Sequence, residues 1–162
     1  MKEKKHLPVI GVGPIIVIPQ LVLTILGIVV SNMGYFDFAK VIFFRYPFLI
    51  VGVIAILGGV YLWFGANFKE KVGEGIVENR LITTGVYSIV RNPIYSAFFL
   101  VCIGAVLIAN NLILLTIPVL GWIYMTIFLI NTEEKWLTDM YGQEYEAYCK
   151  KVNRCIPWFP KR

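Results

Sequence analysis

The sequence has 162 residues, of which 58% are apolar and 15% are charged, with a net charge of +5 and a mean hydropathy of +0.73. A soluble domain is about 45–50% apolar and about 25% charged, and a domain of about 150 residues still exposes about a third of its unfolded surface. The composition therefore excludes a conventional soluble enzyme, a secreted disulfide scaffold and a disordered tail, and it predicts a chain that lies mostly in lipid.

The basic residues flank apolar runs, so anionic lipid head groups rather than nucleic acid are the expected counter-charge. The three cysteines, Cys102, Cys149 and Cys155, show no CxxC spacing, and the chain has one histidine. This set predicts neither a metal site nor a disulfide framework.

Three long stretches without a charge, 7–31, 46–68 and 93–130, indicate membrane helices, because a bilayer core needs roughly 20 apolar residues per helix. The last stretch is too long for one span, and the polar pair Asn110-Asn111 predicts a turn that divides it into a hairpin. We therefore expect an all-α integral membrane protein, a single membrane domain over residues 1–162, with about four spans at 8–30, 46–67, 93–109 and 112–130 and a C-terminal cytoplasmic amphipathic helical segment.

Four spans place both termini on one side of the membrane. Of the 15 lysines and arginines, all but Lys40 and Arg45 fall in the N-terminal segment, in the loop 69–91 or in the C-terminal tail. The positive-inside rule then predicts that both termini and this loop are cytoplasmic. The two cytoplasmic segments, 79–95 and 131–160, hold most of the candidate chemistry.

The first of these segments leads into the third span. Asn92 is a good N-cap and Pro93 suits the first helical turn, which predicts a helix that begins at the cytoplasmic surface. Its free N–H groups, with Arg91 beside them, would bind an anion such as a carboxylate or a phosphate. The alternative is that Arg91 contacts lipid head groups and that Tyr87 and Tyr95 belong to an interfacial aromatic belt.

The second segment begins with Glu133 and Glu134, directly after the fourth predicted span. Carboxylates at the rim of an apolar cavity could bind a cation or accept a proton. The alternative is a solvated helix start, in which Trp136, Leu137 and Met140 form an amphipathic face that lies on the membrane.

Together the two segments form an ordered pattern. The run R-L-I-T-T-G-V-Y-S-I-V-R-N-P-I-Y (80–95) is followed by a helical hairpin, by E-E-x-x-L-x-x-x-Y-G-x-E-Y-x-x-Y (133–148) and by a tail that ends in proline. This set resembles the isoprenylcysteine carboxyl methyltransferase family and its bacterial and archaeal relatives, which include phospholipid methyltransferases. The likeness covers about residues 79–160, half of the chain.

The resemblance implies an integral membrane methyltransferase that uses S-adenosylmethionine and no metal. Its lipophilic acceptor would be a prenylcysteine-like carboxylate, a phospholipid amine or another small lipophilic molecule. Glu134 would be the catalytic residue that takes a proton from an amine or thiol. The residues that would bind the cofactor, with Arg91 added as the anion ligand, are Leu81, Ile82, Tyr87, Arg91, Asn92, Pro93, Ile94, Tyr95 and Glu133.

The sequence departs from this family's pattern at two places. Relatives usually have His at the position of Asn92, and they place an Arg at one of two positions that are Leu129 and Asn131 here. Asn92 keeps a hydrogen-bonding side chain, but an acceptor carboxylate would lack its expected cation. The missing Arg leaves open a non-catalytic membrane protein of the same fold. A second alternative is an NADPH-dependent membrane reductase of related architecture, because membrane sterol reductases have a similar C-terminal arrangement.

Overall fold

The computed structural model describes residues 12–70, 72–78 and 80–157, and all regular secondary structure in these ranges is helical. The all-α prediction is therefore confirmed for the described residues. In chain order the elements are α1 (Gly13–Asn32), the 3-10 helices η1 (Asp37–Ala39) and η2 (Ile42–Phe44), α2 (Arg45–Phe64), the π-helix η3 (Gly65–Lys69), α3 (Val72–Val77), the 3-10 helix η4 (Gly85–Ser88), α4 (Pro93–Ile108), the 3-10 helix η5 (Leu112–Leu115), α5 (Thr116–Asn131), α6 (Glu133–Tyr141) and α7 (Gln143–Lys151).

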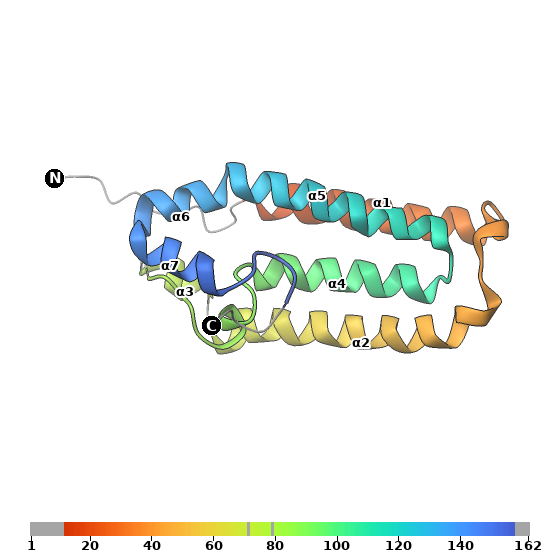
Figure 1. Ribbon diagram of the computed structural model, residues 1–162, viewed down its shortest axis with the longest axis horizontal. Coiled ribbons are helices and arrows are strands. Elements are labelled where there is room, and N and C mark those ends of the chain that lie inside the picture. Colours follow the sequence, from red (N-terminus) through yellow and green to blue (C-terminus); the bar gives the residue numbers. More distant parts are fainter. Residues whose placement is uncertain (1–11, 71, 79, 158–162) are drawn as a thin grey trace.

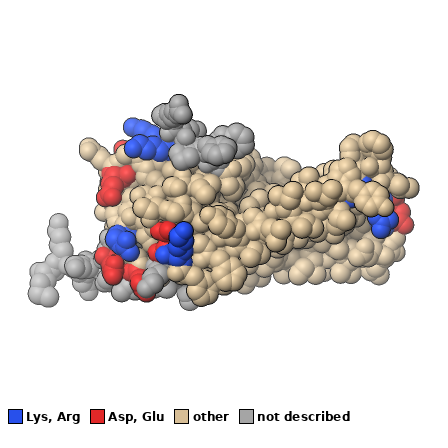
Figure 2. Space-filling view, turned by 90° about the horizontal axis from the view of Figure 1, so that it is seen from below, with Lys and Arg blue, Asp and Glu red and all other residues tan. Residues whose placement is uncertain are grey.

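Four long helices, α1, α2, α4 and α5, run side by side, and α4 packs against the other three (Figure 1). The short helices α3, α6 and α7 gather at one end of this bundle, and the α1–α2 connection lies at the other end (Figure 1). Figure 2 shows charged side chains at these two ends and an uncharged surface between them. This distribution is the one expected of a bundle whose middle lies in lipid.

Within the described residues, three helical stretches are long and apolar enough to cross a membrane: Gly13–Asn32, Ile42–Lys69 and Leu112–Tyr141. The fourth long helix, α4, is apolar but has 16 residues, which is short for a span. The number of four spans therefore stays a prediction. Of the predicted segments, residues 8–11, 79 and 158–160 lie outside the described residues.

Small residues bring α2 and α4 into close contact. A Cβ atom added at Gly59 would lie 2.6 Å from the carbonyl oxygen of Ala97, and one added at Gly52 would lie 2.8 Å from that of Gly104. Lipid gives no hydrophobic drive to helix association, so close backbone approach and van der Waals packing hold such pairs together. This contact fixes α4, whose first residues line the cavity described below.

The predicted turn at Asn110-Asn111 is confirmed. Asn110 has a left-handed φ of 52°, which Asn tolerates better than most residues. Asn111 caps η5 by accepting a hydrogen bond from the Ile113 N–H at 3.1 Å, and its amide nitrogen donates to Ser31 Oγ at 3.0 Å. The turn thus ties the hairpin to the end of α1.

Candidate functional site

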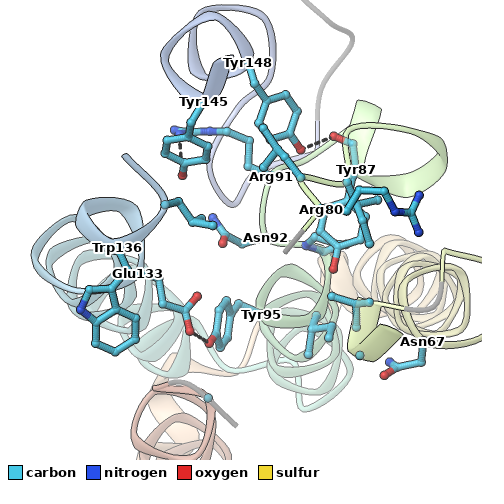
Figure 3. A pocket seen from close by; sticks show the side chains of 18 of the residues that line it. Asn67, Arg80, Tyr87, Arg91, Asn92, Tyr95, Glu133, Trp136, Tyr145 and Tyr148 are labelled. Carbon is cyan, nitrogen blue, oxygen red and sulfur yellow. Dashed lines mark hydrogen bonds between the residues drawn. The ribbon is translucent and has the colours of Figure 1, made fainter. Parts of the chain in front are cut away.

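A cavity of about 500 Å³ lies at the end of the bundle where α3, α6 and α7 gather (Figure 3). Its volume is in the usual range of small-molecule sites, about 300–1,000 Å³. Glu134 does not line it. All nine residues that the sequence assigns to cofactor binding do: Leu81, Ile82, Tyr87, Arg91, Asn92, Pro93, Ile94, Tyr95 and Glu133.

The start of α4 forms one wall of the cavity. Pro93 is the first helical residue, as predicted, because its missing N–H has no partner to lose there. Asn92 is the N-cap residue, as predicted, but its side chain makes no capping hydrogen bond, and its Nδ2 donates to the Arg154 carbonyl oxygen at 3.0 Å. The same carbonyl also accepts from the Asn92 backbone N–H at 3.2 Å, so the tail orients both the backbone and the side chain of Asn92.

The C-terminal tail runs parallel to the segment before α4, with a bridge between Val90 and Asn153. The Arg91 N–H donates to the Asn153 carbonyl at 2.8 Å, and Ser96 Oγ donates to the Cys155 carbonyl at 2.6 Å. These hydrogen bonds fix the backbone of the cavity wall against residues more than 50 positions later in the chain.

Glu133 projects from α6 toward Tyr95 of α4 (Figure 3). The Tyr95 hydroxyl donates a hydrogen bond to Glu133 Oε1, and the Val12 backbone N–H donates to the same oxygen at 3.3 Å. One carboxylate thus joins α4, α6 and the residue before α1, and it places a negative charge on the cavity wall.

Glu134, the next residue, is held by two arginines. Both of its oxygens accept hydrogen bonds from Arg154. Arg154 Nε donates to Oε1 at 2.6 Å, and Arg154 Nη2 donates to Oε2 at 2.9 Å. Oε1 also lies 3.2 Å from Arg91 Nη1. The role of proton acceptor predicted for Glu134 is not tested by this geometry and stays a prediction.

Arg91 connects this ion cluster to the cavity, and its side chain is 8% exposed. Its Nη1 donates to the Tyr145 hydroxyl at 3.4 Å and to Cys149 Sγ, and the guanidinium lies 5.9 Å from the centre of the Tyr145 ring. Its Nε has no hydrogen-bond partner among the described residues. Two guanidinium groups share one carboxylate here, so the cluster carries a net positive charge.

Three tyrosines of the wall stay neutral hydrogen-bonding groups. Burial raises the pKa of Tyr145, an effect that the positive charge of Arg91 partly opposes. Burial also raises the pKa values of Tyr87 and Tyr148, and the Tyr148 hydroxyl donates to the Tyr87 carbonyl at 2.5 Å. These rings therefore offer flat apolar faces and neutral hydroxyls to a ligand.

Sequence reasoning missed several lining residues. Tyr145 and Tyr148 stand three apart in the motif of the second segment, and this spacing on one helix face was a usable signal. Asn67 lies in the π-helix η3, where its amide donates to the Trp63 carbonyl at 2.9 Å. Such π-turns are frequent at functional sites but have no sequence signature that reveals them.

Comparison with known proteins identifies the chain's relatives. The family model described as phospholipid methyltransferase matches residues 47–144. This match covers more than half of the chain, including the start of α4 and both glutamates of α6. The chain belongs to the phospholipid methyltransferase family. With three apolar helices of spanning length, this family member is a multi-pass membrane protein.

Several curated relatives are similar over part of their length. A protein-S-isoprenylcysteine O-methyltransferase from Schizosaccharomyces pombe is 34% identical over 51% of this chain and 35% of the relative. One from Xenopus laevis is 33% identical over 67% of this chain and 40% of the relative. Methanethiol S-methyltransferase 1 from Bradyrhizobium diazoefficiens is 34% identical over 56% of this chain and 30% of the relative. The chain thus matches less than half the length of each of these proteins, and no solved structure matches it significantly.

Proposed function

We propose that this chain is an integral membrane methyltransferase that transfers a methyl group from S-adenosylmethionine to a lipophilic acceptor. The observation that carries the proposal is the convergence of all nine predicted cofactor residues on one cavity. The family and the names of the relatives, which are O- and S-methyltransferases, support the same reaction class. Neither supports the reductase alternative.

The charges of the cavity fit the amino acid end of this cofactor. The cofactor has a carboxylate, an ammonium group and a positive sulfonium. Arg91, with its unpartnered Nε and net positive cluster, would hold the carboxylate, and Glu133 would face the cationic groups. Leu81 and Ile82 would pack against the adenosine together with the tyrosines. When bound, S-adenosylmethionine supplies an electrophilic methyl group on sulfur.

The protein's own contribution is then alignment and exclusion of water, because methyl transfer is an in-line displacement. The hydrogen bond from Tyr95 fixes the Glu133 carboxylate before any ligand arrives. Trp136, Tyr145 and Tyr148 supply aromatic surface that would cover a bound cofactor and exclude water from it. The sequence predicts Glu134 as the proton acceptor, but its contacts with two guanidinium groups support an electrostatic role instead.

We further propose that α1, α2, α4 and α5 all span the membrane and that both termini are cytoplasmic. In the described residues, Lys40 and Arg45 belong to the α1–α2 end, whereas most other lysines and arginines belong to the cavity end. Pro14, Val17 and Phe98, from the membrane helices, line the cavity. They would receive the apolar part of an acceptor that enters sideways from the bilayer.

Ligand-dependent thermal unfolding of the detergent-purified protein tests the proposal. A ligand at about 100 times its Kd stabilises the folded state by about 2.7 kcal/mol. We expect S-adenosylmethionine and S-adenosylhomocysteine to stabilise the protein and NADPH to have no effect. Glu133→Ala should lose the stabilisation, whereas Glu144→Ala, at an exposed position on α7, should keep it.

Stabilisation by NADPH alone would replace the proposal with the reductase alternative. No stabilisation by any of the three ligands would favour a non-catalytic family member. Where S-adenosylmethionine does bind, methyl transfer to a prenylcysteine carboxylate, a phospholipid amine and a lipophilic thiol, measured side by side, identifies the acceptor class.

A further inference from the structure

In the ion cluster of Glu134, Arg91 and Arg154, the two arginines contact the carboxylate unequally. Arg154 takes both oxygens of Glu134, at 2.6 and 2.9 Å, in the bidentate geometry that gives the strongest guanidinium–carboxylate pairs. Arg91 makes a single contact with the same carboxylate at 3.2 Å. Two guanidinium groups compete for one carboxylate, and Arg154 makes the shorter contacts with both of its oxygens.

This division leaves Arg91 with unused binding capacity. Apart from Glu134, its side-chain contacts are with Tyr145 and Cys149, and its Nε has no partner among the described residues. An incompletely paired charge is costly in a buried position, because the interior screens and solvates it poorly. An anion in the cavity would lower that cost. Arg91 lines the cavity and Arg154 does not.

We propose that Arg154 is a positioning residue: by occupying Glu134, it keeps Arg91 available to bind a carboxylate in the cavity. The inference rests on the proposed function, because it takes the carboxylate of S-adenosylmethionine as the ligand of Arg91. Without the Arg154 side chain, Glu134 is free to take Arg91 in a bidentate pair. The net charge of the cluster then falls from +1 to zero, and the cavity loses its anion site.

The rival explanation is that Arg154 only anchors the tail. The tail is already held by backbone contacts that need no Arg154 side chain. The backbone carbonyl of Arg154 accepts a hydrogen bond from the Asn92 side chain. The neighbouring carbonyls of Asn153 and Cys155 accept from the Arg91 backbone N–H and from Ser96 Oγ. Side-chain substitutions at position 154 leave these hydrogen bonds possible, so the two explanations can be separated.

The experiment measures binding of S-adenosylhomocysteine and of its decarboxylated analogue by calorimetry, with the full chain in detergent. Arg154→Gln should lower the affinity for S-adenosylhomocysteine about 10-fold or more, the size expected for the loss of a hydrogen-bonded charge pair. It should leave the decarboxylated analogue within about twofold of its wild-type affinity. Adding Glu134→Gln to Arg154→Gln removes the competing carboxylate, and the double variant should recover most of the lost affinity.

Three results would overturn the inference. In the first, Arg154→Gln lowers the affinity for both ligands equally and the double variant does not recover it, which would show that Arg154 only anchors the tail. In the second, Arg154→Gln leaves S-adenosylhomocysteine binding unchanged. In the third, the wild-type protein binds both ligands equally well, which would mean that Arg91 holds no carboxylate although the cofactor site is real.

A wild-type protein that binds neither ligand would instead refute the proposed function and the inference with it. If Arg154→Gln does not fold, Arg154→Lys carries the test. Its ammonium keeps the positive charge but cannot form the planar bidentate pair. For Arg154→Lys we expect a smaller loss of affinity for S-adenosylhomocysteine and no loss for the decarboxylated analogue. Equal losses of affinity for both ligands would refute the inference.

Discussion

Two adjacent glycines of α2 provide a matched test of the packing that positions the cavity. A Cβ added at Gly59 would lie 2.6 Å from the Ala97 carbonyl oxygen, about 0.8 Å short of the 3.4 Å at which ordinary contact begins. The obstacle is backbone, so no side-chain rotation can relieve it, and α2 and α4 must separate. At Gly58 the nearest atom to an added Cβ is a Leu100 methyl carbon at 3.8 Å, an ordinary contact.

We therefore expect Gly59→Ala to lower the free energy of unfolding by about 1–3 kcal/mol, the usual cost of overpacking. Gly58→Ala should be neutral or stabilising by up to about 1 kcal/mol, because alanine favours helix more than glycine does. Reversible unfolding in detergent or bicelles, followed by helical circular dichroism, measures both.

Because Ala97 lies one turn after Pro93 and Ile94, which line the cavity, Gly59→Ala should also weaken S-adenosylhomocysteine binding, whereas Gly58→Ala should not. Equal stability of the two variants would refute the close α2–α4 contact. A destabilised Gly59→Ala protein with unchanged ligand binding would refute the link from this contact to the site.

Two further predictions concern the tail side of the site. Tyr148→Phe removes the hydrogen bond to the buried Tyr87 carbonyl and should cost about 1–3 kcal/mol in thermal or denaturant unfolding; a stable variant would mean that water replaces the hydroxyl. Burial raises the pKa of Cys155 to about 12. Because the thiolate is the reactive form, Cys155 should react with a maleimide at pH 8 roughly a thousandfold more slowly than a free cysteine. Unfolding should restore its full reactivity. Rapid labelling of the folded protein at Cys155 would contradict the docked tail.

The sequence predicted the parts of the site that depend on local signals. The Asn92-Pro93 step marks a helix start, whereas Leu81, Ile82 and Tyr87 are assigned by the resemblance to a family pattern. All of them do line the cavity.

Contacts between distant segments could not be predicted in this way. Asn92 is the N-cap residue that the local sequence predicts, but its side chain donates a hydrogen bond to the carbonyl of Arg154, 62 positions later, and makes no capping bond. The π-helix η3, which brings Asn67 to the cavity, packs against η4. Both features involve contacts between segments that are distant in the sequence, so local propensity does not reveal them.

The glutamate pair shows how one helical step separates two roles. Successive residues on an α-helix point about 100° apart, and of these two glutamates Glu133 lines the cavity whereas Glu134 does not. Glu133 meets the Tyr95 hydroxyl on the cavity wall, and Glu134 meets Arg154 of the tail. Exchanging their environments would require α6 to rotate, which both sets of contacts resist. In the proposed arrangement, a change at Arg154 reaches the cavity through Glu134, which also contacts Arg91 of the cavity wall.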